Sequence, residues 1–405
     1  MNDRTLYQTI LGLAAPWQVE AVELNMEAQE VLVSVGLSAD VILKCPVCDQ
    51  PAARYDSSEE RRWRHLDSCQ FRTILVSRIP RVRCSEHGVR QIRTPWAEER
   101  SRFTALFESW VIRLLRECSI DSVAALVGAS WDEVAGIQRR AVQRGLARRA
   151  NEPVHAIGVD ETSFQKRHQY VTVITDLEKD RVLWVGDDRK EMTLREGLKT
   201  FGEHLSAIET VVTDMWDPYI AAVRGVIPDW ESKLVFDRYH VMWHVNKAVD
   251  DVRRAERRDP AIRQILMRTR YLWLRGKASR KRKHNRELRE LLRAGLKVGR
   301  AWSIKENLVH LWDFKTIRGA LRYFKQWYGW ASRSRLPEMV RAAKTVRHYL
   351  YGIVNYTTHR YTNARSEAMN AKIQELKYRA RGYRNRESFR SAILFHCGGL
   401  SLDPL

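Results

Sequence analysis

Short apolar runs alternate with helical periodicity through the middle of the chain. Between residues 154 and 237, the runs HAIGVD, YVTVITDLE, RVLWVG, TVVTD and KLVFD are typical of buried strands, whereas MTLREGLKTFGEHL and PYIAAVRGVI have helical spacing. Asp180 and Arg181 form a turn between the second and third runs, so we expect the first three strands to form an antiparallel meander. The pattern predicts a mixed sheet with flanking helices, in which the first strand is central and the fourth lies beside it.

Helical periodicity also dominates the segment that precedes these strands. Apolar spacing predicts a first helix near Phe103 to Glu117, followed by helices in SIDSVAALVG and SWDEVAGIQRRAVQRGLARR. Ser119 and Ser130 stand where N-caps are favoured, and Gly128 fits the turn between the helices. The segment is typical of a helix-turn-helix, although a plain helical hairpin has the same pattern.

The last of these helices carries side chains suited to a DNA surface. Its arginines are expected to contact phosphates, and its glutamines are the candidates for contacts with base edges. These residues are Gln138, Arg139, Arg140, Gln143 and Arg144.

The charge of the whole chain favours a polyanionic partner. Its 405 residues carry 70 Lys plus Arg against 49 Asp plus Glu, a formal net charge of +21 at pH 7. Such a surplus favours nucleic acid, because bound phosphates release their counterions. A membrane surface is the alternative, but no apolar stretch approaches the roughly 20 residues that span a bilayer, and MNDRTLYQTI lacks the blocks of a signal peptide. We therefore expect several globular domains in the cytoplasm, where the six cysteines are thiols or metal ligands.

Two short motifs in the first quarter of the chain predict a metal site. Cys45 and Cys48 form a CPVC turn, and Cys84 with His87 in CSEHG follows after 35 intervening residues. Two knuckles with two ligands each can close a tetrahedral, zinc-ribbon-like site, and the metal would replace a core that so short a segment cannot build. The alternative is that these thiols are ordinary buried small side chains. We expect a structural Zn²⁺, because CxxC in a reducing compartment usually serves a metal or redox chemistry.

Three carboxylates lie where the predicted sheet would direct them toward a common centre. Asp160 and Asp214 end the first and fourth apolar runs, and Glu367 lies on an amphipathic helix in YTNARSEAMNAKI. A single Asp after a strand is more often a cap or turn residue, but two strand ends in this order favour shared ligands. Two Mg²⁺ or Mn²⁺ ions about 4 Å apart require such bridging oxygens. Glu161 should point to the opposite face, and Asp217 has the position of a helix N-cap.

Polar residues around Glu367 suit the same chemistry. Asn363 and Asn370 lie on the helix face that carries Glu367, where amides suit metal-bound water or phosphate. Basic residues follow at once and are suited to holding a phosphodiester strand; the candidates are Lys372, Lys377 and Arg379.

A basic stretch follows the predicted sheet. Residues 253–300 contain 18 Lys or Arg against four acids, yet apolar residues recur at helical spacing, so a basic helical domain is favoured over disorder. Four tryptophans follow, which we expect to anchor helices in a core. The alternative, more specific hypothesis is that one of them stacks on an unpaired base of the cleaved DNA end. The four tryptophans are Trp302, Trp312, Trp327 and Trp330.

These motifs together resemble those of the ISL-three family of bacterial insertion-sequence transposases, over essentially the whole chain. The matching stretches are CPVC with CSEHG, WRHLDSCQFRTIL, the helix-turn-helix segment, VDETSF, VVTDMWDPYIAAV, FDRYHV and NARSEAMNAKIQELKYRARGYRNRESFRSAIL. The resemblance implies a catalytic acid triad of Asp160, Asp214 and Glu367 on a ribonuclease-H-like fold. His87 departs from the cysteine often found as the fourth zinc ligand.

The resemblance also implies a domain organisation. Asp237 and His240 in DRYH look like an acid-x-x-His signature of several transposase groups whose fold carries a helical insertion. We therefore expect an α+β multidomain protein. Its parts are a zinc-binding domain over 1–100, a helix-turn-helix domain over 101–150, a ribonuclease-H-like core over 151–255 and 351–405, and an all-α basic insertion over 256–350.

The residues and the resemblance together predict DNA transposition. The protein is expected to bind terminal inverted repeats of double-stranded DNA, cleave the strand at the element's end and join the freed 3′-OH to target DNA, with no nucleotide cofactor and no membrane. Pairing of two ends favours a homo-oligomer, most simply a dimer, associated with the bacterial nucleoid. The alternatives are a sequence-specific DNA-binding regulator with an inert ribonuclease-H-like domain, and a nuclease that cuts without joining.

Overall fold

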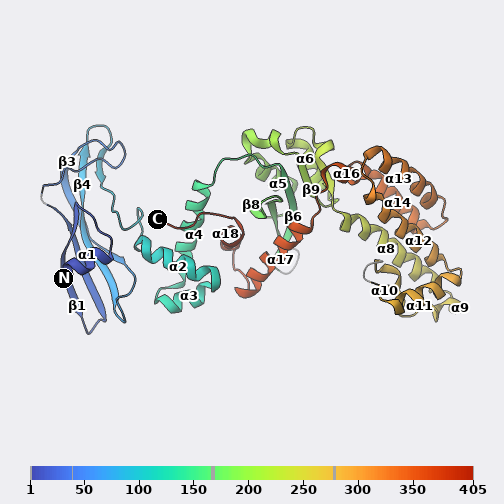
Figure 1. Ribbon diagram of the computed structural model, residues 1–405, viewed down its shortest axis with the longest axis horizontal. Coiled ribbons are helices and arrows are strands. Elements are labelled where there is room, and N and C mark those ends of the chain that lie inside the picture. Colours follow the sequence, from blue (N-terminus) through green and yellow to red (C-terminus); the bar gives the residue numbers. More distant parts are fainter. Residues whose placement is uncertain (1, 39, 166–168, 277–279, 405) are drawn as a thin grey trace. The chain divides into compact units, whose positions relative to one another are not determined.

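The chain forms two compact units. The computed structural model describes residues 2–38, 40–165, 169–276 and 280–404. One unit comprises residues 1–149 together with 400–405, and the other comprises residues 150–399 (Figure 1). The last residues therefore belong with the amino-terminal unit, although the sequence pattern assigned them to the catalytic core. Among the described residues, no helix combines the length and the apolar character that crossing a membrane requires.

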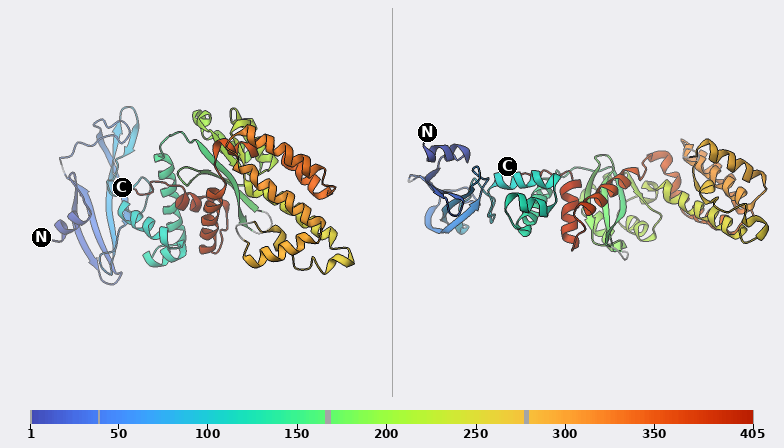
Figure 2. Two further views of the ribbon diagram at one scale, coloured as in Figure 1. Left: turned by 45° about the vertical axis from the view of Figure 1, so that its right-hand side comes forward. Right: turned by 90° about the horizontal axis from the view of Figure 1, so that it is seen from below.

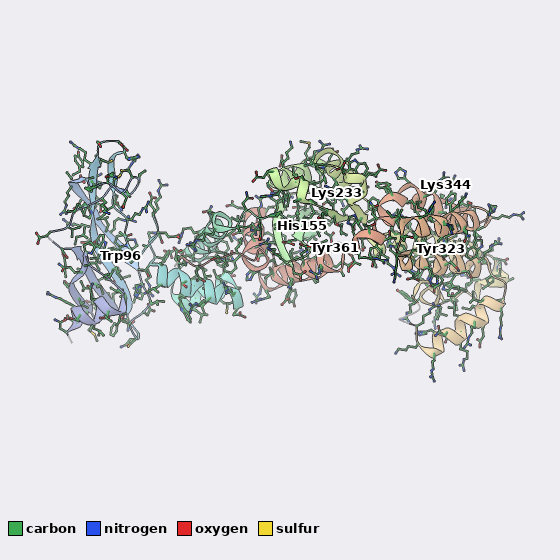
Figure 3. All side chains as sticks on the ribbon, turned by 45° about the horizontal axis from the view of Figure 1, so that its top comes forward. Trp96, His155, Lys233, Tyr323, Lys344 and Tyr361 are labelled. Atoms are coloured by element: carbon green, nitrogen blue, oxygen red, sulfur yellow. The ribbon has the colours of Figure 1, made fainter. Side chains whose placement is uncertain are left out.

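A β-sheet with its own aromatic core forms the first part of the amino-terminal unit. Trp96 packs edge-on against Trp17 and Trp63, with ring centroids 4.7 and 5.5 Å apart, and Leu75 and Ile79 are fully buried beside them (Figure 3). The expectation that a metal would substitute for a core here was wrong, because the sheet recruits residues on both sides of the cysteine motifs. The strands pair in the order β1-β2-β4-β3, with β5 also paired to β4. The elements are α1 (Asp3–Ile10), β1 (Trp17–Asn25), β2 (Glu30–Leu37), β3 (Ala53–Arg64), β4 (Arg72–Cys84) and β5 (Gly88–Gln91).

Three helices follow as predicted: α2 (Ala105–Glu117), α3 (Ile120–Val127) and α4 (Trp131–Arg148). The Ser119 and Ser130 side chains cap α3 and α4, and Gly128 ends α3 with φ of 62°. Glu133 completes a capping box with Ser130. The first helix starts two residues later than predicted, because the hydroxyl of Thr104 caps it.

Residues that follow the second unit pack against this helical group. The Arg144 guanidinium donates to the Leu402 carbonyl, and Ser109 Oγ donates to Asp403 Oδ1 over 2.8 Å. Leu400 packs so closely on Gly145 that a Cβ at position 145 would lie 2.7 Å from the Leu400 Cβ. The segment 400–404 is thus a structural part of the helix-turn-helix.

The second unit contains the predicted mixed sheet. Its strand order is β10-β9-β6-β7-β8. β6, β7 and β8 form the antiparallel meander, and β9 and β10 add parallel strands beside β6, which is the order predicted for a ribonuclease-H-like sheet. The strands are β6 (Ala156–Gln165), β7 (Gln169–Asp176), β8 (Arg181–Gly186), β9 (Thr210–Thr213) and β10 (Leu234–Phe236).

Helices cover both faces of this sheet (Figures 1 and 2). Ile157 and Val159 on β6 share a core with helices α5 and α6, whereas Ala156 faces the other side, together with Val212 of β9 and Val235 of β10. On that second face α17 packs against β6. The helices of the sheet region are α5 (Glu191–Lys199), η1 (Gly202–Ala207), α6 (Asp217–Val226), α7 (Trp230–Lys233), α15 (Leu350–Val354), α16 (Tyr356–His359), α17 (Ala364–Arg379) and α18 (Arg386–Cys397).

A helical insertion separates β10 from α15. Its buried residues join those of the sheet in one continuous core, so the basic helical interpretation is confirmed for the described residues. Trp312 and Trp327 are buried and Trp302 packs against this core, as predicted for anchors, but Trp330 is 39% exposed. The helices are α8 (Arg238–Glu256), α9 (Pro260–Arg263), α10 (Arg270–Leu274), α11 (Arg282–Arg293), α12 (Lys297–Leu308), η3 (Val309–Asp313), α13 (Ile317–Ser332) and α14 (Pro337–His348).

Candidate functional site

Three aspartates lie side by side on three neighbouring strands of the mixed sheet. Asp214 and Asp237 directly follow β9 and β10, but Asp160 lies inside β6, which continues to Gln165 rather than ending at Asp160 as predicted. Gly158 of β6 pairs with Val212 of β9, so Asp160 and Asp214 each lie two residues beyond a paired position. Asp237 directly follows β10, and its backbone N–H donates to the Thr213 carbonyl over 3.2 Å. Side chains alternate along a strand, so the three carboxylates continue the set that faces α17. Parallel register therefore gathers acidic groups at one edge.

Helix α17 supplies amides to Asp160. Asn370 Nδ2 donates to Asp160 Oδ2 over 2.9 Å, and Asn363 Nδ2 lies 3.4 Å from the same oxygen. Glu161 points to the other face, as predicted, where Arg189 pairs with it over 3.4 Å. Asp217 lies in the first turn of α6 rather than at its N-cap, and its carboxylate accepts from the Tyr349 hydroxyl.

Gly158 allows α17 to approach β6 closely. A Cβ at this position would lie 2.2 Å from Ser366 Oγ and 2.9 Å from a methyl group of Leu177. Ser366 is buried and directly precedes Glu367, so the distance between strand and helix sets where the third acid of the predicted triad stands. Glycine at position 158 is therefore required for α17 to lie this close to β6.

Gly158→Ala is expected to destabilise the protein by about 1–3 kcal/mol, the usual cost of overpacking, and to reduce any activity that needs α17 in place. Urea unfolding of the full chain measures the first effect. Gly276→Ala is the matched control, because a Cβ there would meet no atom of the described residues within 4 Å. Equal stability of the two variants would show that α17 can shift without cost.

Asp237 and His240 are joined by helix-capping geometry. The Asp237 carboxylate caps α8 by accepting from the His240 backbone N–H over 3.3 Å. The residue three positions after an N-cap lies in the first turn, and from there His240 Nε2 reaches Asp214 Oδ2 over 3.0 Å. The acid-x-x-His spacing thus joins a strand end to a helix start and brings an imidazole to the carboxylates.

Burial and mutual repulsion raise the pKa values of these acids. The pKa of Asp160 rises to about 6, mainly through burial, and that of Asp214 to about 8 through burial and the neighbouring charge of Asp160. Burial also raises the pKa of Asp237. Asp214 Oδ1 is buried and has no hydrogen-bond partner among the described residues. A cluster of carboxylates with an orphaned oxygen is the donor set that a divalent cation requires.

The structure gathers the predicted site residues only in part. Glu367 is exposed in the first turn of α17, and its charge contributes to the raised pKa of Asp214. Among the described residues, the acidic group whose ligand atoms all lie within 4.8 Å of one another is Asp214, Asp237 and His240, and it includes neither Asp160 nor Glu367. The sequence singled out Asp237 and His240 only by resemblance, whereas their capping spacing is a signal that could have located them. It missed Gly158 and Ser366, which no local pattern marks.

The four predicted zinc ligands converge at one end of the amino-terminal sheet. Cys45 and Cys48 lie in the turn before β3, and Cys84 and His87 flank the turn from β4 to β5. Cys48 Sγ lies 3.7 Å from Cys84 Sγ, which lies 3.6 Å from His87 Nδ1. Sulfur ligands of a tetrahedral zinc with Zn–S bonds of 2.3 Å are separated by about 3.8 Å. Hydrogen bonds from the backbone and side chain of His87 lower the pKa of Cys84 to about 6, so a thiolate is accessible near neutral pH.

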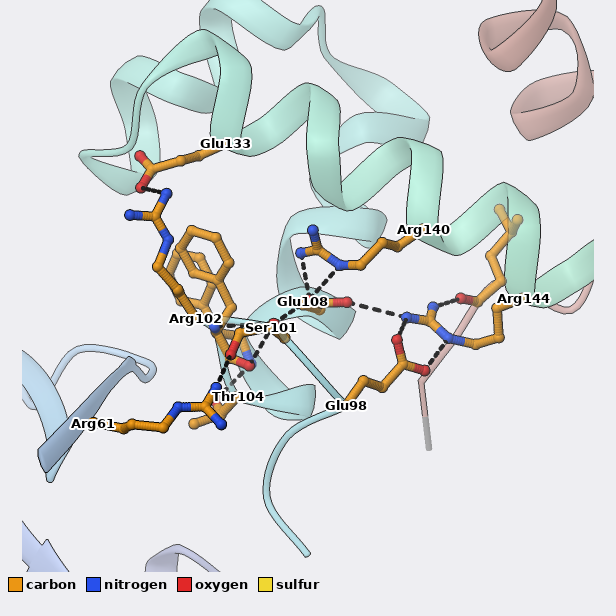
Figure 4. Close-up of polar contacts among 12 residues, drawn as sticks. Arg61, Glu98, Ser101, Arg102, Thr104, Glu108, Glu133, Arg140 and Arg144 are labelled. Carbon is orange, nitrogen blue, oxygen red and sulfur yellow. Dashed lines mark hydrogen bonds and ion pairs between the residues drawn. The ribbon is translucent and has the colours of Figure 1, made fainter. Parts of the chain in front are cut away.

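Two of the predicted DNA contacts on α4 are inaccessible. Gln138 is 5% exposed, and the Arg144 guanidinium is buried in ion pairs with Glu98 and Glu108 over 2.6 and 3.0 Å (Figure 4). Arg140 also pairs with Glu108, over 2.6 Å. Arg140 and Arg144 thus tie α4 to α2, and the burial of Gln138 and Arg144 corrects the expectation that these two residues face DNA. Arg139 and Gln143 remain exposed, one helical turn apart.

The basic residues predicted on α17 also include one that contacts another element and two that are exposed. Lys377 Nζ donates to the Ser163 carbonyl over 2.9 Å and so ties the helix to β6. Lys372 and Arg379 are exposed.

Replacing Glu108 is expected to destabilise the amino-terminal unit by about 3–5 kcal/mol, because its removal leaves the buried Arg144 charge partly uncompensated. Glu108→Ala would be compared with Glu99→Ala in a denaturant titration. Glu99 is exposed, so its substitution should change stability by less than about 0.5 kcal/mol. A small loss of stability in both variants would mean that Glu98 alone is enough to neutralise the buried Arg144 charge.

Comparisons with known proteins cover the same regions. A family model described as Transposase, of the ISL3 group, matches residues 157–393. The helix-turn-helix domain of transposase family ISL3 matches residues 92–142, and the zinc-finger of transposase IS204/IS1001/IS1096/IS1165 matches residues 43–87. The first match covers the sheet and α17, and the last covers the four converging ligands.

Two curated relatives align over almost their whole length. The chain is 26% identical to the transposase for insertion sequence element IS1557 of Mycobacterium tuberculosis, with 96% of this chain and 94% of the relative covered. It is also 26% identical to the transposase for insertion sequence element IS1001 of Bordetella parapertussis, with coverages of 96% and 97%. With its catalytic, helix-turn-helix and zinc-finger regions all matched, the chain belongs to the ISL3 family of insertion-sequence transposases.

Proposed function

We propose that this transposase cuts and joins DNA by metal-ion catalysis at the edge of its mixed sheet. The supporting observation is the alignment of Asp160, inside β6, with Asp214 and Asp237 at the ends of β9 and β10, together with raised pKa values and an orphaned Asp214 oxygen. Uncompensated buried carboxylates are costly unless cations neutralise them. The carboxylates of this edge offer oxygen ligands, which fit Mg²⁺ or Mn²⁺.

Each residue has a distinct part in this proposal. Asp160 and Asp214 hold the ions, the Asn370 amide fixes the orientation of the Asp160 carboxylate, and Glu367 completes the ligand set from α17. Metal ions held by these residues would supply activation of the attacking water or 3′-OH and neutralisation of charge on the leaving oxygen. Glu367 is exposed and is held in α17 by its backbone, so its side chain is free to turn toward an ion. Lys372 and Arg379 are placed on the same helix to contact phosphates.

The amino-terminal unit is proposed to recognise the terminal inverted repeats. Arg139 and Gln143 form the exposed pair on α4 that is suited to phosphate and base contacts, respectively. Zn²⁺ bound by Cys45, Cys48, Cys84 and His87 would fix the turn between β4 and β5. Because two ends are joined in one reaction, we propose that the protein acts as a homo-oligomer, most simply a dimer, on DNA in the cytoplasm.

The function is tested with the purified protein, Mg²⁺, a duplex carrying the repeats that flank its own gene, and a supercoiled target plasmid. Transposition predicts a nick at the repeat boundary and a product in which the duplex is joined to the plasmid. A DNA-binding regulator would retard the duplex without cutting it, and a nuclease would cut it without the joined product. Either of these outcomes would replace the proposal.

A further inference from the structure

We infer that His240 is a direct metal ligand, so that Asp214, Asp237 and His240 together hold one divalent cation through two carboxylates and an imidazole. This inference rests on the proposed function and adds to it a nitrogen ligand from a different helix. One ligand atom from each of these three residues lies within 4.8 Å of the ligand atoms of the other two. They come from β9, from the end of β10 and from the first turn of α8.

The geometry of the cluster fits a coordination shell. His240 Nε2 and Asp214 Oδ2 are 3.0 Å apart. Neighbouring ligands of an octahedral ion with bonds of 2.0–2.2 Å are separated by about 3 Å, so both atoms can be bound without moving. Asp237 is 6% exposed, and its fixed role as the α8 N-cap keeps its carboxylate at this edge of the sheet.

Two unpartnered oxygens adjoin the cluster. Asp214 Oδ1 is buried and has no hydrogen-bond partner in the described part of the chain, and the same holds for Oδ1 of Asn363. Asn363 is 1% exposed, donates from its backbone to Asp237 and lies 3.4 Å from Asp160 through its amide nitrogen. Buried acceptors without donors require an explanation, and a nearby cation or its bound water provides one. With one oxygen facing His240 and the other unpaired, Asp214 is the carboxylate placed to bridge two ions.

The nitrogen ligand has a chemical consequence. Mg²⁺ prefers an all-oxygen shell, whereas first-row transition ions also bind nitrogen ligands, with affinity rising from Mn²⁺ to Co²⁺ in the Irving–Williams order. An ion held partly by His240 should therefore bind more tightly as Mn²⁺ than as Mg²⁺, and His240→Asp should reverse part of that preference by restoring an all-oxygen set.

The experiment is pulsed electron paramagnetic resonance of Mn²⁺ bound to the full-length, zinc-loaded protein. Direct ligation predicts a ¹⁴N coupling on the Mn²⁺ signal that changes to the ¹⁵N pattern when the protein is labelled with ¹⁵N-histidine; this readout requires no substitution. His240→Gln should remove the coupling and weaken Mn²⁺ binding by about tenfold. His244→Gln, one turn further along α8 and outside the cluster, should retain both.

The outcomes separate this inference from the proposed function. Mn²⁺ that binds in an Asp214-dependent manner but shows no histidine coupling would overturn the role of His240 and leave the proposed function intact. A coupling that persists in His240→Gln would overturn it equally, by assigning the nitrogen to another residue. If millimolar Mn²⁺ does not bind and strand cutting is independent of Asp214, the inference and the proposed function both fail.

Discussion

Replacing Asp214 by Asn is expected to reduce strand cutting by about 10³-fold or more while leaving binding to the terminal repeats almost unchanged. Asn keeps the size of the side chain but removes the negative charge needed at the carboxylate best placed to bridge two ions. Cutting of the flanking-repeat duplex in Mg²⁺ measures the first effect, and a gel-shift titration measures the second. Asp217→Asn is the matched control, because this exposed residue lies outside the acidic cluster. Comparable losses in both variants would contradict the assignment.

The same substitution is expected to stabilise the metal-free protein. Burial raises the pKa of Asp214 to about 8 from an ordinary value of 3.8, so the folded state holds a proton that the unfolded chain releases. The stability that this retained proton gives the folded state is fully present below pH 3.8 and is lost as the pH rises through 8. Above pH 8 the wild-type protein should therefore melt at a lower temperature than Asp214→Asn. Adding Mg²⁺ should raise the melting temperature of the wild type much more than that of the variant.

Loss of a cysteine ligand should have the second large effect. Cys84→Ser is expected to release the zinc and to remove several of the roughly 10–16 kcal/mol that structural zinc contributes in small fingers. The loss should be local, because the Trp17, Trp63 and Trp96 core of the sheet does not include the metal site. Hydrogen exchange would then rise in the two turns around the ligands, while the tryptophan fluorescence stays native.

Zinc content is measured by atomic emission after dialysis, with Cys69→Ser as the control. Cys69 is exposed and lies outside the ligand group, so that variant should retain its zinc. Full zinc content in Cys84→Ser would remove Cys84 from the site. Global unfolding of the sheet would instead restore the idea that the metal replaces a core.

Sequence periodicity predicted the catalytic sheet well, because its strands are buried on both faces and appear as uninterrupted apolar runs. None of the strands of the amino-terminal sheet was predicted from the sequence. β3 is the hardest of them to predict, because this edge strand is almost entirely polar and its pairing with β4 is not visible in its own sequence. Cap residues identified α3 and α4 correctly, since Ser119 and Ser130 act on amides only three residues away. Local signals therefore predicted local structure.

Contacts between residues far apart in the sequence could not be predicted from local signals. Arg144 has the residue type and the helix position expected of a DNA contact, but it is buried in ion pairs with Glu98 and Glu108. No spacing rule links these positions in the sequence. The same limit applies to the candidate catalytic site. Asp160 and Asp214 could be predicted because each follows a buried apolar run, although β6 continues beyond Asp160. The close approach at Gly158 and the contact of His240 with Asp214 depend on how separate elements pack.

The return of residues 400–404 to the helix-turn-helix imposes an order on biosynthesis. A ribosome makes α2, α3 and α4 early, but the partners of Ser109, Arg144 and Gly145 emerge only after the entire catalytic unit has been translated. Nascent or prematurely terminated polypeptides thus lack part of the packing that steadies this segment. We expect a product stopped before residue 400 to hold α4 less firmly than the full chain, because the contacts of Leu400, Leu402 and Asp403 are missing.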